Sequence, residues 1–454
     1  MAVSTPKKNK TKKELAVVES VDSQVVRASG DEQEKENSET IDGQSNVKDI
    51  PTPEQSAEVG GALNFAPDSK VQMKFIKLVT STGSERSKSA LNVDGEVYFR
   101  QIISAVVETE YHERVKGGFT AAKSVKEPKL DDNGQPVLND KGKPVMVTKT
   151  STAHYIGGGK ATKKKDCVRM TDNPNYKKEY NSLIVLAQIV HYGSKILNSI
   201  SYPKERKRKG SEDKFFDESK RVLPMHWVSQ NIENGFNLFD DLKAYKWIEF
   251  NNVRYYLKWA PGINTHSESF GAVAWAKYER KESRSLIIVW DKGGITSQSI
   301  EFDCSYDEPM EGDSELHGGG GIVSLIEYLR KLCTDGQRAV ELSFDELRSI
   351  VWNSKYVDGK VKAFYEGEDL SEKLAIAINQ WLKGAAGDAL KDMTGRGQQV
   401  PIYLCGGGFQ IESVREVICE KMRSGKVPQE NIILCDEPQT IATTYTSKYY
   451  ANLR

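Results

Sequence analysis

Short, uninterrupted apolar runs alternate with amphipathic segments of helical period from residue 65 onward, and this alternation restricts the possible folds more than any other feature of the chain. Runs rich in β-branched and aromatic residues predict strands at 75–79, 96–108, 247–260, 285–290, 297–304, 400–405 and 431–435. Apolar residues spaced three and four apart predict helices at 181–200, 321–333, 344–353, 368–390 and 411–425, the last with Gly425 as its C-cap. The alternation predicts an α/β protein whose sheets combine hairpins with parallel strands.

The composition changes near residue 65, which predicts a boundary between a tail and a folded region. Residues 1–64 are rich in Lys, Glu, Ser, Asp and Gln and hold no aromatic residue, so they cannot bury enough apolar surface to order themselves. We therefore expect 1–64 to be a disordered tail, 65–225 to form a first domain and 226–454 a second. DNG and DKG turn signals predict a β-hairpin insertion at about 127–150. The charged segment 202–214 is interpreted as an exposed loop.

The charge is balanced over the whole chain, with 64 Lys and Arg residues against 64 Asp and Glu residues, so the net charge does not attract nucleic acid or an anionic membrane. Direct contact with nucleic acid is expected only through the basic N-terminal tail or the loop at 204–209. No run of 18 apolar residues is present and no apolar segment follows the basic N-terminus, so we expect a cytoplasmic protein that does not contact membranes. Six separate cysteines without a CxxC pair indicate buried thiols.

The segment IIVWDKGGITSQSIEF, residues 287–302, combines an apolar strand, an Asp–Gly turn and a second strand. Gly293 and Gly294 leave the backbone amides of the turn free of side chains, so that a phosphate can approach them. Thr296 adds a hydroxyl donor, and Asp291 is the kind of ligand that hydrated Mg²⁺ accepts beside phosphate oxygens. A purely structural hairpin explains this segment alone equally well, so other motifs must decide between the two interpretations.

A run of three glycines supports the nucleotide interpretation. Gly406, Gly407 and Gly408 join a buried strand to an amphipathic helix within residues 400–418. Without side chains, this backbone can lie flat against a nucleotide near the helix N-terminus. A plain strand-to-helix turn rarely needs three glycines.

Two further segments add charged groups. The strand and turn at 77–88 end at Lys88, whose ammonium group can meet phosphate oxygens. The segment 263–278 predicts a helix with small residues on one face. Glu268 is expected in the first turn of this helix, where the helix dipole favours a carboxylate.

Taken in this order, these motifs resemble the actin, DnaK-type chaperone and sugar kinase superfamily, and most closely its actin-like ParM/StbA plasmid-partitioning branch. The first phosphate loop of that family has the form D-x-G-S-x-x-x-K, which residues 81–88, STGSERSK, resemble. The second has the form D-x-G-x-x-T, which is similar to Asp291 through Thr296. Segments 154–165, 317–329 and 437–450 also resemble the family, so the similarity spans roughly residues 70–450.

The resemblance implies a two-domain actin-like ATPase fold, each domain with an RNase H-like mixed sheet flanked by helices, and the C-terminal helix returning to the first domain. It implies that ATP and Mg²⁺ bind between the domains, with Asp291 holding metal-bound water, Lys88 contacting the phosphates and Glu268 orienting the attacking water. The remaining nucleotide contacts implied are Gly83, Ser84, Gly293, Gly294 and Thr296 at the phosphates and Gly406, Gly407 and Gly408 at the adenosine.

One residue departs from the family pattern. The aspartate that opens the family's first phosphate loop is replaced here by Ser81. In the family that carboxylate helps to hold the hydrated Mg²⁺, and phosphoryl transfer depends on such electrostatic positioning. We therefore expect nucleotide binding with slow hydrolysis.

The resemblance further implies self-association into nucleotide-dependent filaments that segregate plasmid DNA or position cargo, through a DNA-binding adaptor protein. Two alternatives stay open. One is a monomeric chaperone or small-molecule kinase on the same fold, and the absence of a C-terminal peptide-binding segment argues against the chaperone. The other is a scaffold that binds nucleotide without turnover, which Ser81 favours.

Other chemistries fit the sequence poorly. The HGGGG run at 317–321 is suited to an esterase oxyanion loop, but the chain has no GxSxG nucleophile elbow. No HExxH and no GxxxxGK[ST] motif is present, which argues against a zinc protease and a P-loop nucleotidase.

Overall fold

The computed structural model describes residues 74–83, 85–173, 175–207, 214–230, 235–334 and 342–452. The tail expected at 1–64, Ser84 of the expected first phosphate loop and residues 208–209 of the basic loop lie outside the described residues. Within the described ranges, no helix has both the length and the apolar character needed to cross a lipid bilayer.

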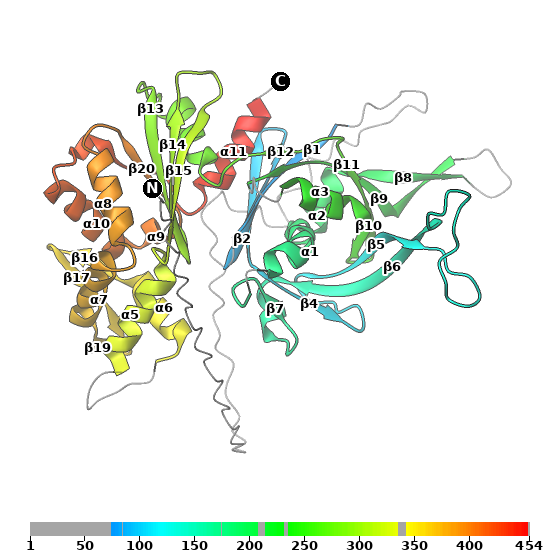
Figure 1. Ribbon diagram of the computed structural model, residues 1–454, viewed down its shortest axis with the longest axis horizontal. Helices are drawn as coiled ribbons and strands as arrows, with labels where there is room; N and C mark the ends of the chain where they lie inside the picture. The colour runs from blue at the N-terminus through cyan, green and yellow to red at the C-terminus, as the bar shows by residue number, and fades with distance from the viewer. Residues whose placement is uncertain are drawn as a thin grey trace, which may run out of the picture. The chain divides into compact units, whose positions relative to one another are not determined.

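A mixed sheet of 12 strands forms the first half of the described fold (Figure 1). Its strands are β1 (Ile76–Thr82), β2 (Arg86–Val93), β3 (Glu96–Ile103), β4 (Ala105–Thr109), β5 (Gly118–Pro128), β6 (Met146–Gly157), β7 (Val168–Arg169), β8 (Tyr202–Lys207), β9 (Lys214–Ser229), β10 (Tyr245–Phe250), β11 (Val253–Trp259) and β12 (Asn264–Thr265). Their order is β3-β2-β1-β9-β11-β10-β5-β6-β4-β7, with β8 and β12 also paired to β9. Strands β3, β2 and β1 are antiparallel, whereas β9 is parallel to β1 and β11 is parallel to β9.

A second mixed sheet repeats this order of strand directions. It consists of β13 (Leu286–Lys292), β14 (Thr296–Asp303), β15 (Met310–Gly318), β20 (Ile402–Cys405) and β21 (Ile432–Leu434), in the order β15-β14-β13-β20-β21. Here β15, β14 and β13 are antiparallel, and β20 and β21 run parallel to β13. Two small hairpins pair β16 (Lys355–Val357) with β17 (Lys360–Lys362) and β18 (Phe364–Tyr365) with β19 (Glu368–Asp369).

Three helices contribute to the apolar core beside the first sheet (Figure 1). They are α1 (Tyr176–Val190), α2 (Gly193–Ser199) and α3 (Gly235–Ala244), and a 3-10 helix, η1, covers Gly158–Lys163. Ile184 of α1 is fully buried with Leu78 of β1 and Trp227 of β9. The Trp227 indole donates a hydrogen bond to Thr80 Oγ1 at 2.8 Å, so its one polar atom is satisfied inside the core.

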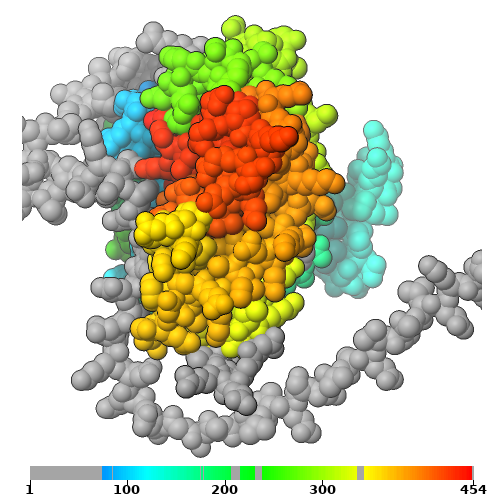
Figure 2. All heavy atoms as spheres, turned by 90° about the vertical axis from the view of Figure 1, so that its left-hand side faces the viewer, coloured from blue at the N-terminus to red at the C-terminus, as the bar shows by residue number. Residues whose placement is uncertain are grey.

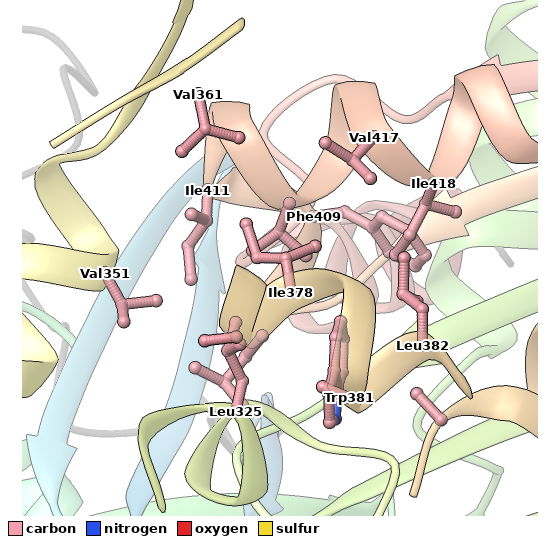
Figure 3. Close-up of a cluster of buried hydrophobic side chains, with 14 of the residues drawn as sticks. Leu325, Val351, Val361, Ile378, Trp381, Leu382, Phe409, Ile411, Val417 and Ile418 are labelled. Atoms are coloured by element: carbon pink, nitrogen blue, oxygen red, sulfur yellow. The ribbon is translucent and has the colours of Figure 1, made fainter. Parts of the chain in front are cut away.

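Six helices surround the core beside the second sheet. They are α5 (Ile322–Thr334), α6 (Phe344–Asn353), α7 (Ser371–Lys383), α8 (Gly387–Arg396), α9 (Gly407–Gln410) and α10 (Glu412–Ser424). Figure 3 shows Leu325, Ile378, Trp381, Phe409 and Ile418 from four of these helices packed together, and all five side chains are buried. On the face that Figure 2 shows, the residues coloured yellow to red form most of the surface of this half, with green residues above them.

Two more helices pack closely against each other and connect the halves. They are α4 (Phe270–Ala274), which continues as a π-helical turn, η2 (Trp275–Glu279), and α11 (Ile441–Asn452). A Cβ atom on Gly271 would lie 1.9 Å from the Ala442 carbonyl oxygen, so this crossing needs a glycine. Ile441 belongs to the apolar cluster of the second sheet, whereas Tyr450 packs with Val79 of the first. Helix α11 therefore contacts both sheets.

The structure confirms most of the expected elements and corrects four. The single helix expected at 181–200 is wrong, because the chain divides into α1 and α2 before Gly193, whose φ is +79°. The hairpins at 247–260 and 285–304 are antiparallel, as predicted. The single strand expected at 96–108 is wrong, because Ser104 separates β3 from β4. The single helix expected at 368–390 is also wrong: it divides at Gly384, whose backbone torsions of −107° and −108° are not helical. The exposed loop expected at 202–214 begins as strand β8, which pairs with β9.

The first sheet crosses the domain boundary expected at 225/226. Strand β9 spans this position, and β11 and β12 pair with it as parallel strands. Because hydrogen bonds join these strands, the first sheet extends to Thr265 and the second sheet begins at Leu286. The hairpin insertion expected at 127–150 is the outer part of the longer β5–β6 hairpin.

Candidate functional site

The turn between β1 and β2 is the first glycine turn of the site. Ser81 and Lys88 are register partners on the two strands. A Cβ atom on Gly83 would lie 2.5 Å from the Arg86 carbonyl oxygen, so a side chain at this position would collide with the backbone. Ser104 Oγ donates a hydrogen bond to the Gly83 carbonyl at 2.6 Å. The turn is therefore tight, and Ser104, which lies between β3 and β4, holds it in place.

The turn between β13 and β14 is the second. The Gly293 amide donates to the Thr296 carbonyl at 3.0 Å, which closes the turn. The amides of Ile322 and Val323, at the start of α5, donate to the Gly293 and Gly294 carbonyls at 3.2 and 2.8 Å. These amides have no acceptor within their own helix, so the turn supplies one. Helix α5 thus fixes the orientation of the turn.

The first and second turns face each other. A Cβ atom on Gly294 would lie 3.0 Å from Glu85 Oε2, which belongs to the first turn. The other oxygen of Glu85 accepts a hydrogen bond from Arg348 Nη1 on α6 at 2.7 Å. A glycine at 294 therefore allows the close approach of a charged side chain from the first half of the fold.

The third glycine turn packs against the end of β13. Gly406 has a φ of +91°, and a Cβ atom there would lie 2.2 Å from Asp291 Oδ1. A Cβ atom on Gly408 would lie 2.6 Å from Lys292 Cγ. At Gly407 the nearest neighbours would be side-chain atoms at 3.7 and 3.9 Å, which is ordinary contact. Of the three glycines, Gly407 has room beside it.

The structure brings the two predicted catalytic carboxylates and the predicted phosphate-binding lysine together. Burial raises the pKa of Asp291 to about 6, and the negative charge of Glu268 adds to this rise. The positive charges of Lys88 and Lys292 and a hydrogen bond from Cys405 act in the opposite direction. Asp291, Glu268 and Lys88 therefore interact electrostatically, although more than 200 residues separate the first and last along the chain.

Glu268 is positioned differently from the sequence prediction. It lies in the turn before α4, with Ser269 as the N-cap, and the first turn of the helix carries no acidic residue. The expectation that Glu268 lies in the first turn is therefore wrong, because the helix begins later than its apolar pattern suggested. Instead, Ser81 Oγ donates a hydrogen bond to Glu268 Oε1 at 3.2 Å.

The oxygen atoms of the site are suitable ligands for Mg²⁺. Asp291 and Glu268 supply carboxylates, and Ser81 supplies a hydroxyl group beside Glu268. The two carboxylates repel each other, which contributes to the raised pKa of Asp291. A divalent cation would offset that repulsion. Mg²⁺ prefers such oxygen ligands together with phosphate oxygens and water.

Sequence analysis missed the environment of Lys292. Its side chain is fully buried, and Nζ donates to the Gly320 carbonyl at 3.1 Å. The ammonium group also lies 4.8 and 4.7 Å from the ring centroids of Trp290 and Trp381. Burial lowers the pKa of Lys292 to about 7. Its place beside Asp291 at the end of an apolar strand was the one signal available in the sequence.

Comparison with solved structures finds several similar chains. A 15-stranded ParM filament from Clostridium botulinum is 15% identical, with a TM-score of 0.54, and the alignment covers 84% of this chain and 100% of that one. A non-polymerisable quadruple mutant of pCBH ParM is 14% identical with a TM-score of 0.50, over 84% and 100% of the two chains. An archaeal actin homologue is 12% identical with a TM-score of 0.52, over 83% and 99%.

Sequence comparison adds nothing to this, because no protein-family model and no curated protein matches the chain. At identities this low, the structural similarity establishes the fold. The two mixed sheets share the same order of strand directions, and two helices contact each other between them. Together with these structural neighbours, they show that the described chain has the two-domain actin-like fold of ParM and the archaeal actin homologue.

Proposed function

We propose that this protein binds ATP together with Mg²⁺ at the three glycine turns, and that the bound nucleotide controls its assembly into filaments. The observation that carries the proposal is the convergence on Asp291. The backbone of Gly406 lies close to its Oδ1 atom. The negative charge of Glu268 raises the pKa of Asp291, and the positive charge of Lys88 lowers it. Glycine turns, a cation and paired carboxylates are the groups that a metal-bound triphosphate needs.

Each residue has a distinct role in this proposal. Lys88 binds phosphate oxygens, and the backbones of Gly83, Gly293 and Gly294 allow the phosphates to approach, with Ser84 and Thr296 as hydroxyl donors. Gly407, which has space beside it, faces the adenosine together with its two neighbours. Asp291 holds water of the hydrated metal. When bound, Mg²⁺ supplies the positive charge that stabilises the transferring phosphoryl group.

Ser81 sets the expected rate of hydrolysis. It holds Glu268 at 3.2 Å, so Glu268 can orient a water molecule, but it brings no carboxylate of its own. Phosphoryl transfer then proceeds with less electrostatic stabilisation, and slow ATP hydrolysis follows. The same observation favours the second candidate, a scaffold that binds nucleotide without turnover.

The filament part of the proposal is supported by the fold shared with a ParM filament. In such an assembly the protein would act in the cytoplasm, associate with copies of itself and move or position DNA through an adaptor protein. A small-molecule kinase on the same fold is the alternative without self-association.

High-speed sedimentation of the full chain with Mg·ATP, with Mg·ADP and without nucleotide tests the proposal. We expect pelleting with Mg·ATP that is reduced with Mg·ADP and absent without nucleotide. Binding of a fluorescent ATP analogue is measured on the same samples. Binding without pelleting would favour the scaffold or kinase, and the absence of any binding would refute the nucleotide site itself.

A further inference from the structure

A second cluster of chemically active side chains lies at the edge of the second sheet. The edge strand β15 carries Glu315 and His317, and α8, which packs against β14, carries Asp392. One ligand atom from each of the three side chains lies within 4.8 Å of the other two. An imidazole and two carboxylates from separate elements therefore converge on one point.

Several polar atoms here are buried and have no hydrogen-bond partner among the described residues. His317 is only 8% exposed, and its Nε2 atom is unpartnered. Asp392 Oδ2 is also buried without a hydrogen-bond partner. The same is true of the hydroxyl group of Ser299, which is the register partner of Glu315 on β14. Leaving such atoms unsatisfied costs free energy, so their concentration at one place indicates that a ligand satisfies them.

The charge around the cluster favours a cation. Arg396 Nη1 is 3.8 Å from Asp392 Oδ2, but its Nη2 atom is hydrogen-bonded to Glu301 Oε2 at 2.6 Å. Asp392 and Glu301 thus share one guanidinium group, and Glu315 adds a third carboxylate to the cluster, which leaves an excess of negative charge.

We propose that Glu315, His317 and Asp392 form a binding site for a divalent transition metal of the Zn²⁺ class. Zn²⁺ accepts imidazole nitrogen and carboxylate oxygen together, whereas Mg²⁺ and Ca²⁺ prefer oxygen ligands alone. Three protein ligands leave a fourth position for water, as in open zinc sites. This site is separate from the glycine turns and does not depend on the proposed nucleotide function.

The geometry needs only a small adjustment to accept the ion. Bonds of about 2.0–2.2 Å in a tetrahedral site place ligand atoms about 3.4 Å apart. One ligand atom from each of the three side chains lies within 4.8 Å of the others, so closing to this spacing takes shifts of up to about 1.4 Å. The Glu315 side chain is 58% exposed, so it can rotate towards the ion without disturbing the core.

Isothermal titration calorimetry tests the proposal, with ZnCl₂ titrated into the nucleotide-free, chelator-treated full chain. We expect one saturable site whose binding persists in excess MgCl₂. His317→Gln and Asp392→Asn are expected to abolish it, and Glu315→Gln to weaken it by about tenfold or more. Because Glu315 is exposed, its substitution keeps the test valid even where the two more buried substitutions impair folding.

Two variants serve as matched controls. Asp313→Asn removes an exposed carboxylate from the same strand, and His154→Gln removes an imidazole from the first half of the fold. Both are expected to bind Zn²⁺ like the wild type. The thermal unfolding midpoint should rise with ZnCl₂ in the wild type and these controls only. No saturable binding, or equal loss in Glu315→Gln and Asp313→Asn, would overturn the proposal.

Discussion

Ser81 Oγ donates a hydrogen bond to Glu268 Oε1 over 3.2 Å, which joins a strand of the first sheet to the turn that begins helix α4. Ser81 is buried, and Glu268 also influences the charge of Asp291. This hydrogen bond therefore orients Glu268, the carboxylate proposed to position water. Ser81, which donates it, stands where the actin-like family has an aspartate.

Ser81→Asp is expected to raise Mg·ATP hydrolysis by about 10- to 100-fold, because it adds a metal-binding carboxylate to the site. Without nucleotide and metal, the new charge lies close to Glu268, and Lys88 on the neighbouring strand offsets only part of the repulsion. The variant should then lose about 1–3 kcal/mol of its free energy of unfolding. Steady-state phosphate release and urea unfolding measure the two effects.

Ser81→Ala is the matched control for this substitution. It removes the hydrogen bond without adding charge, so we expect a loss of about 0.5–1.5 kcal/mol in stability and no gain in hydrolysis. Equal hydrolysis by the wild type and Ser81→Asp would contradict the role assigned to this position.

Asp291→Asn is expected to abolish Mg²⁺-dependent binding of nucleotide, because the amide cannot replace the carboxylate as a ligand for the hydrated ion. Nucleotide affinity is measured with and without Mg²⁺. Asp303, at the far end of the same hairpin, provides the control Asp303→Asn, which should bind normally. Unchanged binding in Asp291→Asn would refute its assignment.

The raised pKa of Asp291 predicts a pH dependence of stability in the absence of nucleotide. Its value of about 6 in the folded protein exceeds the ordinary 3.8, so the folded state binds this proton more tightly than the unfolded state. The contribution of Asp291 to the free energy of unfolding therefore falls as pH rises from about 4 to about 6. Asp291→Asn should be more stable than the wild type by roughly 1–3 kcal/mol at pH 7, and this difference should shrink towards pH 4. A difference that does not vary with pH would contradict this.

Gly406→Ala should be far more damaging than Gly407→Ala. The first substitution combines a φ of +91° with a Cβ atom 2.2 Å from Asp291 Oδ1, so we expect a loss of about 2–4 kcal/mol. The second places its Cβ atom at ordinary contact distances and should change stability by less than about 1 kcal/mol. Gly407→Ala should instead weaken nucleotide binding. Chemical unfolding and nucleotide titration separate the two effects, and similar stabilities would contradict the prediction.

Lys292→Met is expected to stabilise the protein by about 1–3 kcal/mol at pH 6, because it removes a buried charge. The lowered pKa of Lys292, about 7, means that the folded state loses this proton more readily than the unfolded state. The free energy of unfolding of the wild type should therefore rise relative to that of Lys292→Met as pH increases from about 7 towards 10.

Lys292→Arg is the control for this prediction, because its guanidinium group stays charged over that range and shows no such gain. If Lys292→Met is instead destabilised equally at every pH, the hydrogen bond from the ammonium group to the Gly320 carbonyl outweighs the cost of burying the charge.

Local patterns predicted the elements of this fold well where each element follows its own periodicity. The two antiparallel hairpins, helix α6 and the strand before Gly406 occur as expected, because turn residues and apolar spacing act over a few residues. The same locality explains the failures. Lys383 and Gly384 carry the helix-end signal also seen at Gly425, but helix-forming residues resume beyond them, so the segment alone does not separate an end from a continuation. The charged segment from 202 pairs with β9 only because the sheet is there to receive it.

The candidate site divides in the same way. The sequence by itself predicted the glycine turns, Asp291, Lys88 and Glu268 as candidate site residues, because each motif lies within a short segment whose residue types suit phosphate and Mg²⁺. Only the tertiary structure decided that Ser81 holds Glu268 across 187 positions. It also decided that Gly406 lies against Asp291 and that Lys292 is buried among aromatic rings. Such contacts depend on which strands pair and which helices cross, and these choices come from the packing of the whole chain, which no short segment records.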